Sequence, residues 1–178
     1  MAPIDNHTLS AHCMHFLLPE CRIFSESSGI LLLGDCMKND QRILSSVVKT
    51  TAMGQTGIRA VLHSSMEPEL KMALRQQLQC YEGLEGTARQ LAEKKSCRVK
   101  NPDPMLRYMI EHMSWMKIGR KHHSTRIADM VIQGNTQGMV KTLRDAHRFP
   151  CRDPEIRALG QQLLSCELAH IRQMQPFL

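Results

Sequence analysis

The chain has 178 residues, a formal net charge of +6, 42% hydrophobic residues and only 4% aromatic residues. This length favours one domain with its own core, and a core of aliphatic side chains and methionine suits helices better than sheets. No apolar run approaches the roughly 20 residues of a membrane span, and the first basic residue is Arg22, so a signal peptide is not predicted. Seven cysteines, an odd number without a CxxC pair, argue against a disulfide framework and favour a reducing cytoplasm.

Residues 1–36 differ from the rest of the chain. They hold three of the seven cysteines, a Ser-rich SESSG stretch and little helical periodicity, whereas the pattern becomes regular from Met37 onward. We expect them to be either a flexible extension or an artefact of an upstream start codon, with Met37 the native start. Residues 37–178 are then a single helical-bundle domain.

Helical periodicity and its stop signals predict four long helices and a short one. Pro68 suits a first helical turn, Asp103-Pro104 and Asp153-Pro154 are helix starts, and Ser124 or Thr125 can cap a helix. The predicted helices cover residues 40–64, 68–96, 103–119, 124–147 and 154–174.

The lengths of the connections predict how the helices pack. The first two long helices are joined tightly, as are the last two, and a long segment near 97–123 connects the pairs. Two antiparallel hairpins with one long crossover form the layout of a ferritin-like four-helix bundle, here with a short extra helix in the crossover. A plain five-helix array is the competing arrangement.

Each long helix carries polar residues in the middle of its apolar stripe, when residues are placed at 100° intervals. These residues form a predicted buried polar cluster: Gln55, Gln77, Tyr81, Asn135 and Glu167. Equal distances from the turns predict that Gln55 faces Gln77 and that Asn135 faces Glu167. The first interpretation is a hydrogen-bond network that fixes helix register, since buried amides and carboxylates need partners.

The alternative interpretation is a metal site. Glu167-Leu-Ala-His170 matches the Glu-x-x-His motif of ferritin-like di-metal proteins, and the equivalent place on the second helix ends at Cys80. The other expected carboxylates are neutral amides, which argues against two hard cations. This alternative is a degenerate ferritin-like metal or redox protein with one transition-metal ion (iron, manganese, zinc or copper) on Glu167, His170 and Cys80.

Two features surround the crossover. A stripe of soft ligands could hold Cu(I), although methionine more often fills an irregular core; its members are Met105, Met109, His112, Met113 and Met116. A basic patch is either a solvated helix junction or a contact for an anionic partner, and no nucleic-acid motif accompanies it. The patch comprises Lys117, Arg120, Lys121 and Arg126, with His122 and His123.

Glycines predict a close approach of helices. Gly134 and Gly138 lie four residues apart at one edge of an apolar stripe, and Gly54 and Gly57 offer a partner surface on the first helix. We therefore expect two helix backbones to cross closely there, beside Asn135.

Three segments carry a resemblance to a known family: TAMGQTGIRAVL (51–62), STRIADMVIQGNTQGMV (124–140) and IRQMQPFL (171–178). They resemble small uncharacterised helical proteins of Gram-positive anaerobic bacteria, associated with ferritin-like bundles, although Arg126 stands where that family carries a histidine. The resemblance implies a fold and a bacterial origin but no activity.

Hydrolase, kinase and dehydrogenase motifs are absent from the sequence. The leading interpretation is a non-enzymatic bundle that associates with itself or with a protein partner. If it is an enzyme, a ferritin-like metal-dependent oxidoreductase fits best.

Overall fold

The computed structural model of the chain describes residues 31–64, 66–104 and 123–178. Four long helices make up this part of the chain: α1 (Leu31–Val61), α2 (Pro68–Lys94), α4 (His123–Arg148) and α5 (Pro154–Met174). A short 3-10 helix, η1 (Gln175–Phe177), follows α5. The predicted all-α class is confirmed for the described residues. The predicted short helix of the crossover and its Met/His stripe lie almost entirely within residues 105–122, outside them.

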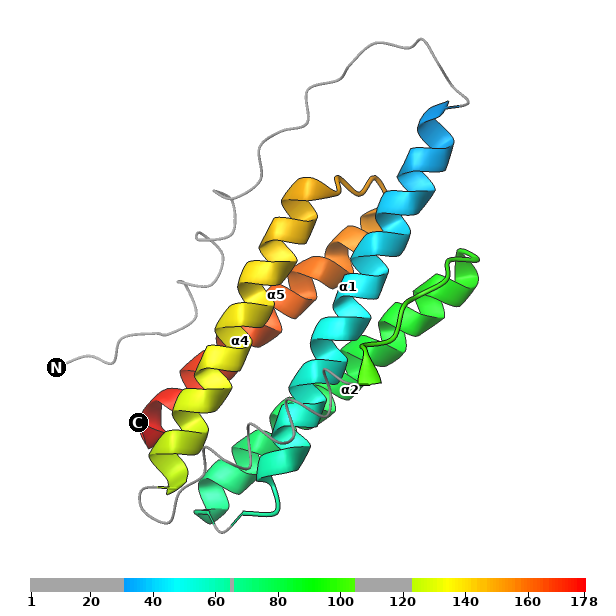
Figure 1. Cartoon of the computed structure of the whole chain (residues 1–178). Coiled ribbons are helices and arrows are strands. Elements are labelled where there is room, and N and C mark those ends of the chain that lie inside the picture. Colours follow the sequence, from blue (N-terminus) through cyan, green and yellow to red (C-terminus); the bar gives the residue numbers. More distant parts are fainter. Residues whose placement is uncertain (1–30, 65, 105–122) are drawn as a thin grey trace, which may run out of the picture.

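The four helices pack as a bundle of two hairpins. Helices α1 and α2 form one antiparallel hairpin, α4 and α5 form the other, and the contacts of α1 with α4 and of α2 with α5 join them. Figure 1 shows that α1 and α5 run in one direction along the bundle while α2 and α4 run in the other. The four adjacent pairs, α1–α2, α4–α5, α1–α4 and α2–α5, are therefore antiparallel, and α2 ends at the opposite end of the bundle from the start of α4.

Local signals explain most of the helix boundaries. The Asp153 side chain caps α5 by accepting hydrogen bonds from the backbone N–H groups of Glu155 (2.9 Å) and Ile156 (3.2 Å). Pro68 occupies the first turn of α2, as predicted, because a first-turn residue needs no N–H partner. The prediction for α1 was wrong at its start: the helix begins at Leu31, not near residue 40. No proline lies within residues 31–61, so no proline prevents the helix from beginning before residue 40.

The core consists of aliphatic side chains from all four helices. Its largest fully buried members are leucines, isoleucines and valines, with Met174 near the end of α5. Among the described residues, no helix combines the length and the apolar character that crossing a bilayer requires. The core also contains polar side chains, and these form the site described next.

Candidate functional site

A hydrogen-bond network crosses the middle of the bundle at Tyr81. The Tyr81 hydroxyl on α2 lies 2.5 Å from Oδ1 of Asn135 on α4 and 2.9 Å from Oε2 of Glu167 on α5. All three side chains are buried, with Glu167 only 1% exposed. The predicted proximity of Asn135 and Glu167 is therefore observed, with the tyrosine hydroxyl between them.

The protons of this network can be assigned from its geometry. Nδ2 of Asn135 donates to the backbone oxygen of Val131 (2.9 Å), which leaves Oδ1 as an acceptor for the Tyr81 hydroxyl. The single hydroxyl proton of Tyr81 is shared between Oδ1 of Asn135 and Oε2 of Glu167, which both accept from it. Burial raises the pKa of Glu167 to about 8, although the hydrogen bond with Tyr81 acts in the opposite direction. Burial and the neighbouring Glu167 also raise the pKa of Tyr81, which therefore stays protonated.

Two glycines provide the space for these side chains. A Cβ atom at Gly138 would lie 2.5 Å from Oε1 of Glu167, and one at Gly54 would lie 2.5 Å from the ring of Tyr81. A Cβ atom at Gly134, in contrast, would have no neighbouring atom within 4 Å. The expected backbone-to-backbone crossing at these glycines is thus wrong: Gly54 and Gly138 make room for side chains.

The other predicted pair does not form. Gln55 donates to Oε2 of Glu85 (2.7 Å), whereas Gln77 donates to Gln173 (3.0 Å) and to the backbone oxygen of His170 (3.3 Å). Gln55 and Gln77 are both buried, as the helical pattern predicted. Their pairing was wrong because distance from the turn equals height only if the loop adds no offset between the two helices. Here Gln55 contacts a residue about two helical turns beyond Gln77.

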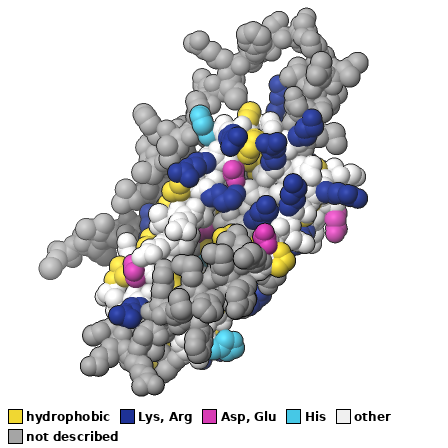
Figure 2. Space-filling model, in the orientation of Figure 1, with side chains coloured by type: hydrophobic (Ala, Val, Ile, Leu, Met, Phe, Trp, Pro, Cys, Tyr) yellow, Lys and Arg dark blue, Asp and Glu magenta, His cyan; other side chains and the backbone are white. Residues whose placement is uncertain are grey.

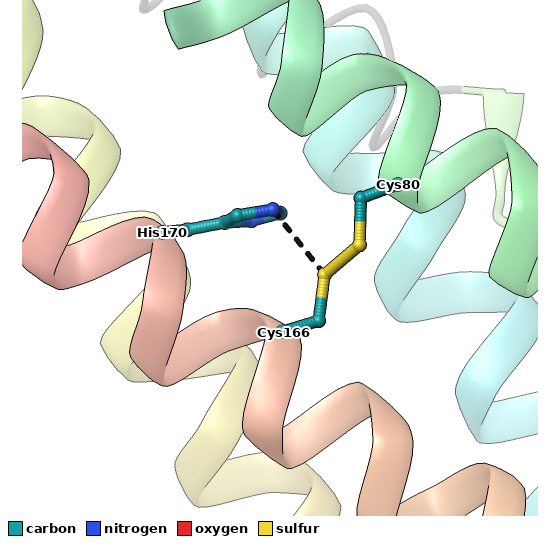
Figure 3. Close-up of side chains that lie close together, drawn as sticks. All are labelled: Cys80, Cys166 and His170. Carbon is teal, nitrogen blue, oxygen red and sulfur yellow. Dashed lines mark hydrogen bonds between the residues drawn. A yellow bond between two sulfur atoms is a disulfide. The ribbon is translucent and has the colours of Figure 1, made fainter. Parts of the chain in front are cut away.

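A second group of side chains lies on the interface of α2 and α5. A disulfide joins Cys80 of α2 to Cys166 of α5, and Nε2 of His170 lies 3.2 Å from Sγ of Cys166. The sulfur and imidazole ligand atoms of these three residues all lie within 4.8 Å of one another. Figure 3 shows the imidazole pointing from the next turn of α5 toward the sulfur pair. We refer to Cys80, Cys166 and His170 as the thiol–imidazole cluster.

Burial determines the protonation state of the histidine in this cluster. Burial lowers the pKa of His170 to about 4, so the imidazole is neutral at pH 7. The ring also packs edge-on against Tyr81, with centroids 4.9 Å apart. Its Nδ1 atom is buried and has no hydrogen-bond partner in the described part of the chain.

The structure brings Cys80 and His170 together, as the sequence suggested, and places Cys166 beside them. Oε2 of Glu167 bonds instead to Tyr81. The spacing of Cys166 and His170, four residues apart on one helix face, is the signal that the sequence interpretation overlooked. The link between Cys80 and Cys166 was not predicted either.

The remaining described cysteines have a different environment. Cys97 and Cys151 are free thiols in loops. Burial, together with a hydrogen bond to Asp40, raises the pKa of Cys151 to about 12, and burial also raises the pKa of Cys97. Such thiols resist ionisation, which makes them poor nucleophiles.

The predicted basic patch can be followed only in part. Its residues Lys117, Arg120 and Lys121 lie outside the described residues, and Arg126 is exposed on α4. Figure 2 shows further Lys and Arg side chains gathered on one face of the bundle, with few acidic ones between them.

Comparison with known proteins does not place the chain in a family: no family model, curated protein or solved structure matches it. The geometry of the two clusters is therefore the basis for any functional proposal.

Proposed function

We propose that the protein is a thiol-based metal-binding protein in which Cys80, Cys166 and His170 hold one thiophilic ion, Zn²⁺ or Cu⁺. The convergence of two cysteine sulfurs and one imidazole nitrogen within 4.8 Å in the bundle carries this proposal. Thiolates and imidazole are the ligands that these ions prefer.

The donor set fits such an ion in number and spacing. With a zinc–sulfur distance of about 2.3 Å, two sulfurs on a tetrahedral ion lie about 3.8 Å apart. Three protein ligands also leave a fourth position on the ion for a small molecule, and metal binding through Nε2 places the imidazole proton on Nδ1.

The oxidation state of Cys80 and Cys166 then determines whether the site can bind the ion. In the disulfide form the sulfurs bond to each other and cannot act as thiolates. Reduction by a phosphine breaks the S–S bond and yields two thiols, while the phosphine takes up oxygen from water as its oxide. Binding of the ion then displaces the two thiol protons. In a reducing compartment, such as the predicted cytoplasm, the dithiol form is the stable one.

The polar network fits a structural role beside this site. Tyr81, Asn135 and Glu167 link three helices, which favours one register over others in a bundle that otherwise has an aliphatic core. The two hairpins with one long connection match the ferritin-like layout, in which metal ligands project into the bundle from facing helices. Self-association or a protein partner would involve the outer faces of the helices.

Metal analysis of untagged protein tests the proposal. The full chain is reduced with a phosphine, loaded anaerobically with Zn²⁺ or Cu⁺, dialysed and analysed for metal content. We expect one ion per chain in the reduced protein and none in the disulfide form. Cys80→Ser, Cys166→Ser and His170→Ala should each lose the ion or weaken its binding at least tenfold.

Matched variants give the controls. Cys97→Ser and Cys151→Ser remove thiols outside the cluster and should leave the stoichiometry unchanged. Glu167→Gln tests the ligand set first predicted from the sequence and should also retain the ion. Metal-free reduced protein, or an ion that survives both His170→Ala and Cys80→Ser, would refute the proposal.

A further inference from the structure

A cavity of about 370 Å³ lies between α1 and α4, on the other side of the polar network from the thiol–imidazole cluster. Its base is formed by the buried residues Gln77, Tyr81 and Glu167, and its rim includes the exposed Gln133 and Gln137 of α4. Met53 and Met130 contribute thioether walls. This volume lies at the lower end of the range for small-molecule sites, about 300–1,000 Å³.

Two polar oxygens of cavity-lining residues have no hydrogen-bond partner and can each accept a hydrogen bond. Oε1 of Gln77 and Oγ1 of Thr50 are buried, and neither has a hydrogen-bond partner among the described residues. Both side chains line the cavity and are more than nine-tenths buried. Native proteins leave few such atoms unsatisfied, so each needs an explanation.

The carboxyl of Glu167 adds a third acceptor. Its Oε1 lies beside Gly138, and the same point of α4 is flanked by the side chain of Thr50. No lysine or arginine of the described segments forms an ion pair with Glu167. Lys141 at the edge of the cavity is paired with Asp145 at 2.5 Å. A buried carboxyl without a cation and two oxygens without donors thus share one cavity.

We infer that this cavity binds a small alkylammonium ion. Its charged head would donate to the oxygens of Glu167, Gln77 and Thr50, and its alkyl chain would lie along the methionine and isoleucine side chains of the walls. An ammonium group has three N–H donors and no acceptor, which matches a site of three acceptors. A carboxylate ligand has no donor for these oxygens, and an alcohol supplies only one donor and no charge.

Methyl NMR of the full chain labelled at methionine tests this inference. The probes are 3-methylbutan-1-amine and its isosteres 3-methylbutan-1-ol and 3-methylbutanoate. The amine should shift the methyl signals of Met53 and Met130 in a saturable way, and leave the exposed Met72, which does not line the cavity, unchanged. The alcohol and the acid should bind at least tenfold more weakly.

Isosteric variants locate the head group. Thr50→Val should weaken amine binding several-fold, and Gln77→Leu about tenfold or more, because a hydrogen bond to a charged group is lost. Thr87→Val and Gln79→Leu, at exposed positions outside the cavity, are the matched controls and should not change binding. Glu167→Gln should reduce the preference for the amine over the alcohol.

Three outcomes would overturn the inference. They are the absence of a saturable shift at Met53 and Met130 with the amine, equal binding of the alcohol, and unchanged amine affinity in both Thr50→Val and Gln77→Leu. The measurement uses no metal and keeps the disulfide intact, so its result is independent of the proposed metal site.

Discussion

Substituting alanine at Gly138 and at Gly134 should change the free energy of unfolding in opposite directions. Both glycines lie within α4, and replacing a helical glycine with alanine stabilises a helix by about 1 kcal/mol. At Gly134 the added methyl group meets nothing within 4 Å, so this gain should be retained.

At Gly138 the same methyl group meets the polar network. Its Cβ would lie 2.5 Å from Oε1 and 3.1 Å from Cδ of Glu167, and 3.1 Å from Cγ2 of Thr50. The Glu167 side chain can move only by giving up its bond to Tyr81, because both are buried. Overpacking of this kind costs about 1–3 kcal/mol, and the lost hydrogen bond adds about 1 kcal/mol. We expect Gly138→Ala to be about 1–3 kcal/mol less stable than wild type, after the helix gain is subtracted.

Urea denaturation followed by circular dichroism measures the free energy of unfolding of both variants. Their m-values should be equal, so that the free energies can be compared. A Glu167→Ala background isolates the cause: only Cγ2 of Thr50, at 3.1 Å, then remains near the added methyl group, so Gly138→Ala should lose most of its cost there. Equal stabilisation by the two alanines in the otherwise wild-type chain would show that Glu167 is not held beside Gly138, and the network as described would be wrong.

Other perturbations test separate contacts. Tyr81→Phe leaves two buried partners without their hydrogen bond and should lower the free energy of unfolding by about 2–4 kcal/mol, measured by urea denaturation; a loss below 0.5 kcal/mol would contradict the network. Asp153→Ala removes the cap of α5 and should cost about 1 kcal/mol, unlike the neighbouring Arg152→Ala. Burial acts to raise the pKa of Asp145, but hydrogen bonds from Lys141 and Ser46 outweigh it and lower the pKa below 3.8. The ionised Asp145 therefore stabilises the folded protein at pH 7, and this stabilisation is lost as the pH falls through the lowered pKa. Asp145→Asn should therefore destabilise the protein by about 1 kcal/mol at pH 7 but not near pH 2, and a pH-independent difference would count against this ion pair. Phosphine reduction of the Cys80–Cys166 bond, which joins residues 86 apart in the sequence, should lower the unfolding free energy by about 4–5 kcal/mol, and Cys80→Ser should be insensitive to the phosphine.

The helix pattern predicted which residues are buried better than it predicted what they touch. Placing residues at 100° intervals correctly assigned Gln77, Asn135 and Glu167 to the interior, because burial depends only on which face of its own helix a residue occupies. Contacts also depend on how far one helix is shifted along its neighbour and on the angle between them. The conformation of the loops sets that shift, and helical periodicity does not predict it. Gln55 therefore has Glu85 as its partner in place of the expected Gln77.

The same limit explains the thiol–imidazole cluster. Cys166 and His170 lie on one face of one helix, so their proximity was readable from their spacing alone. Cys80 was placed beside His170 by analogy with the ferritin-like ligand pattern, whereas its position opposite Cys166 depends on the offset between α2 and α5, two helices separated by the long connection. The glycines were misread for a similar reason, since small residues leave space without indicating whether a backbone or a side chain fills it.

The two clusters share one structural element, the interface of α2 and α5. Cys80 precedes Tyr81 and Cys166 precedes Glu167, so consecutive residues, about 100° apart on each helix, send sulfur to one side of the interface and oxygen to the other. The spacing of α2 and α5 that the sulfurs set, as a disulfide or around an ion, is therefore also the spacing that brings the Tyr81 hydroxyl to Glu167. An ion at the sulfurs and an ammonium ligand at the carboxyl would both depend on that spacing. If the spacing differs between the loaded and the empty site, each ligand must change the affinity of the other by the same factor, because linkage between two binding sites is reciprocal.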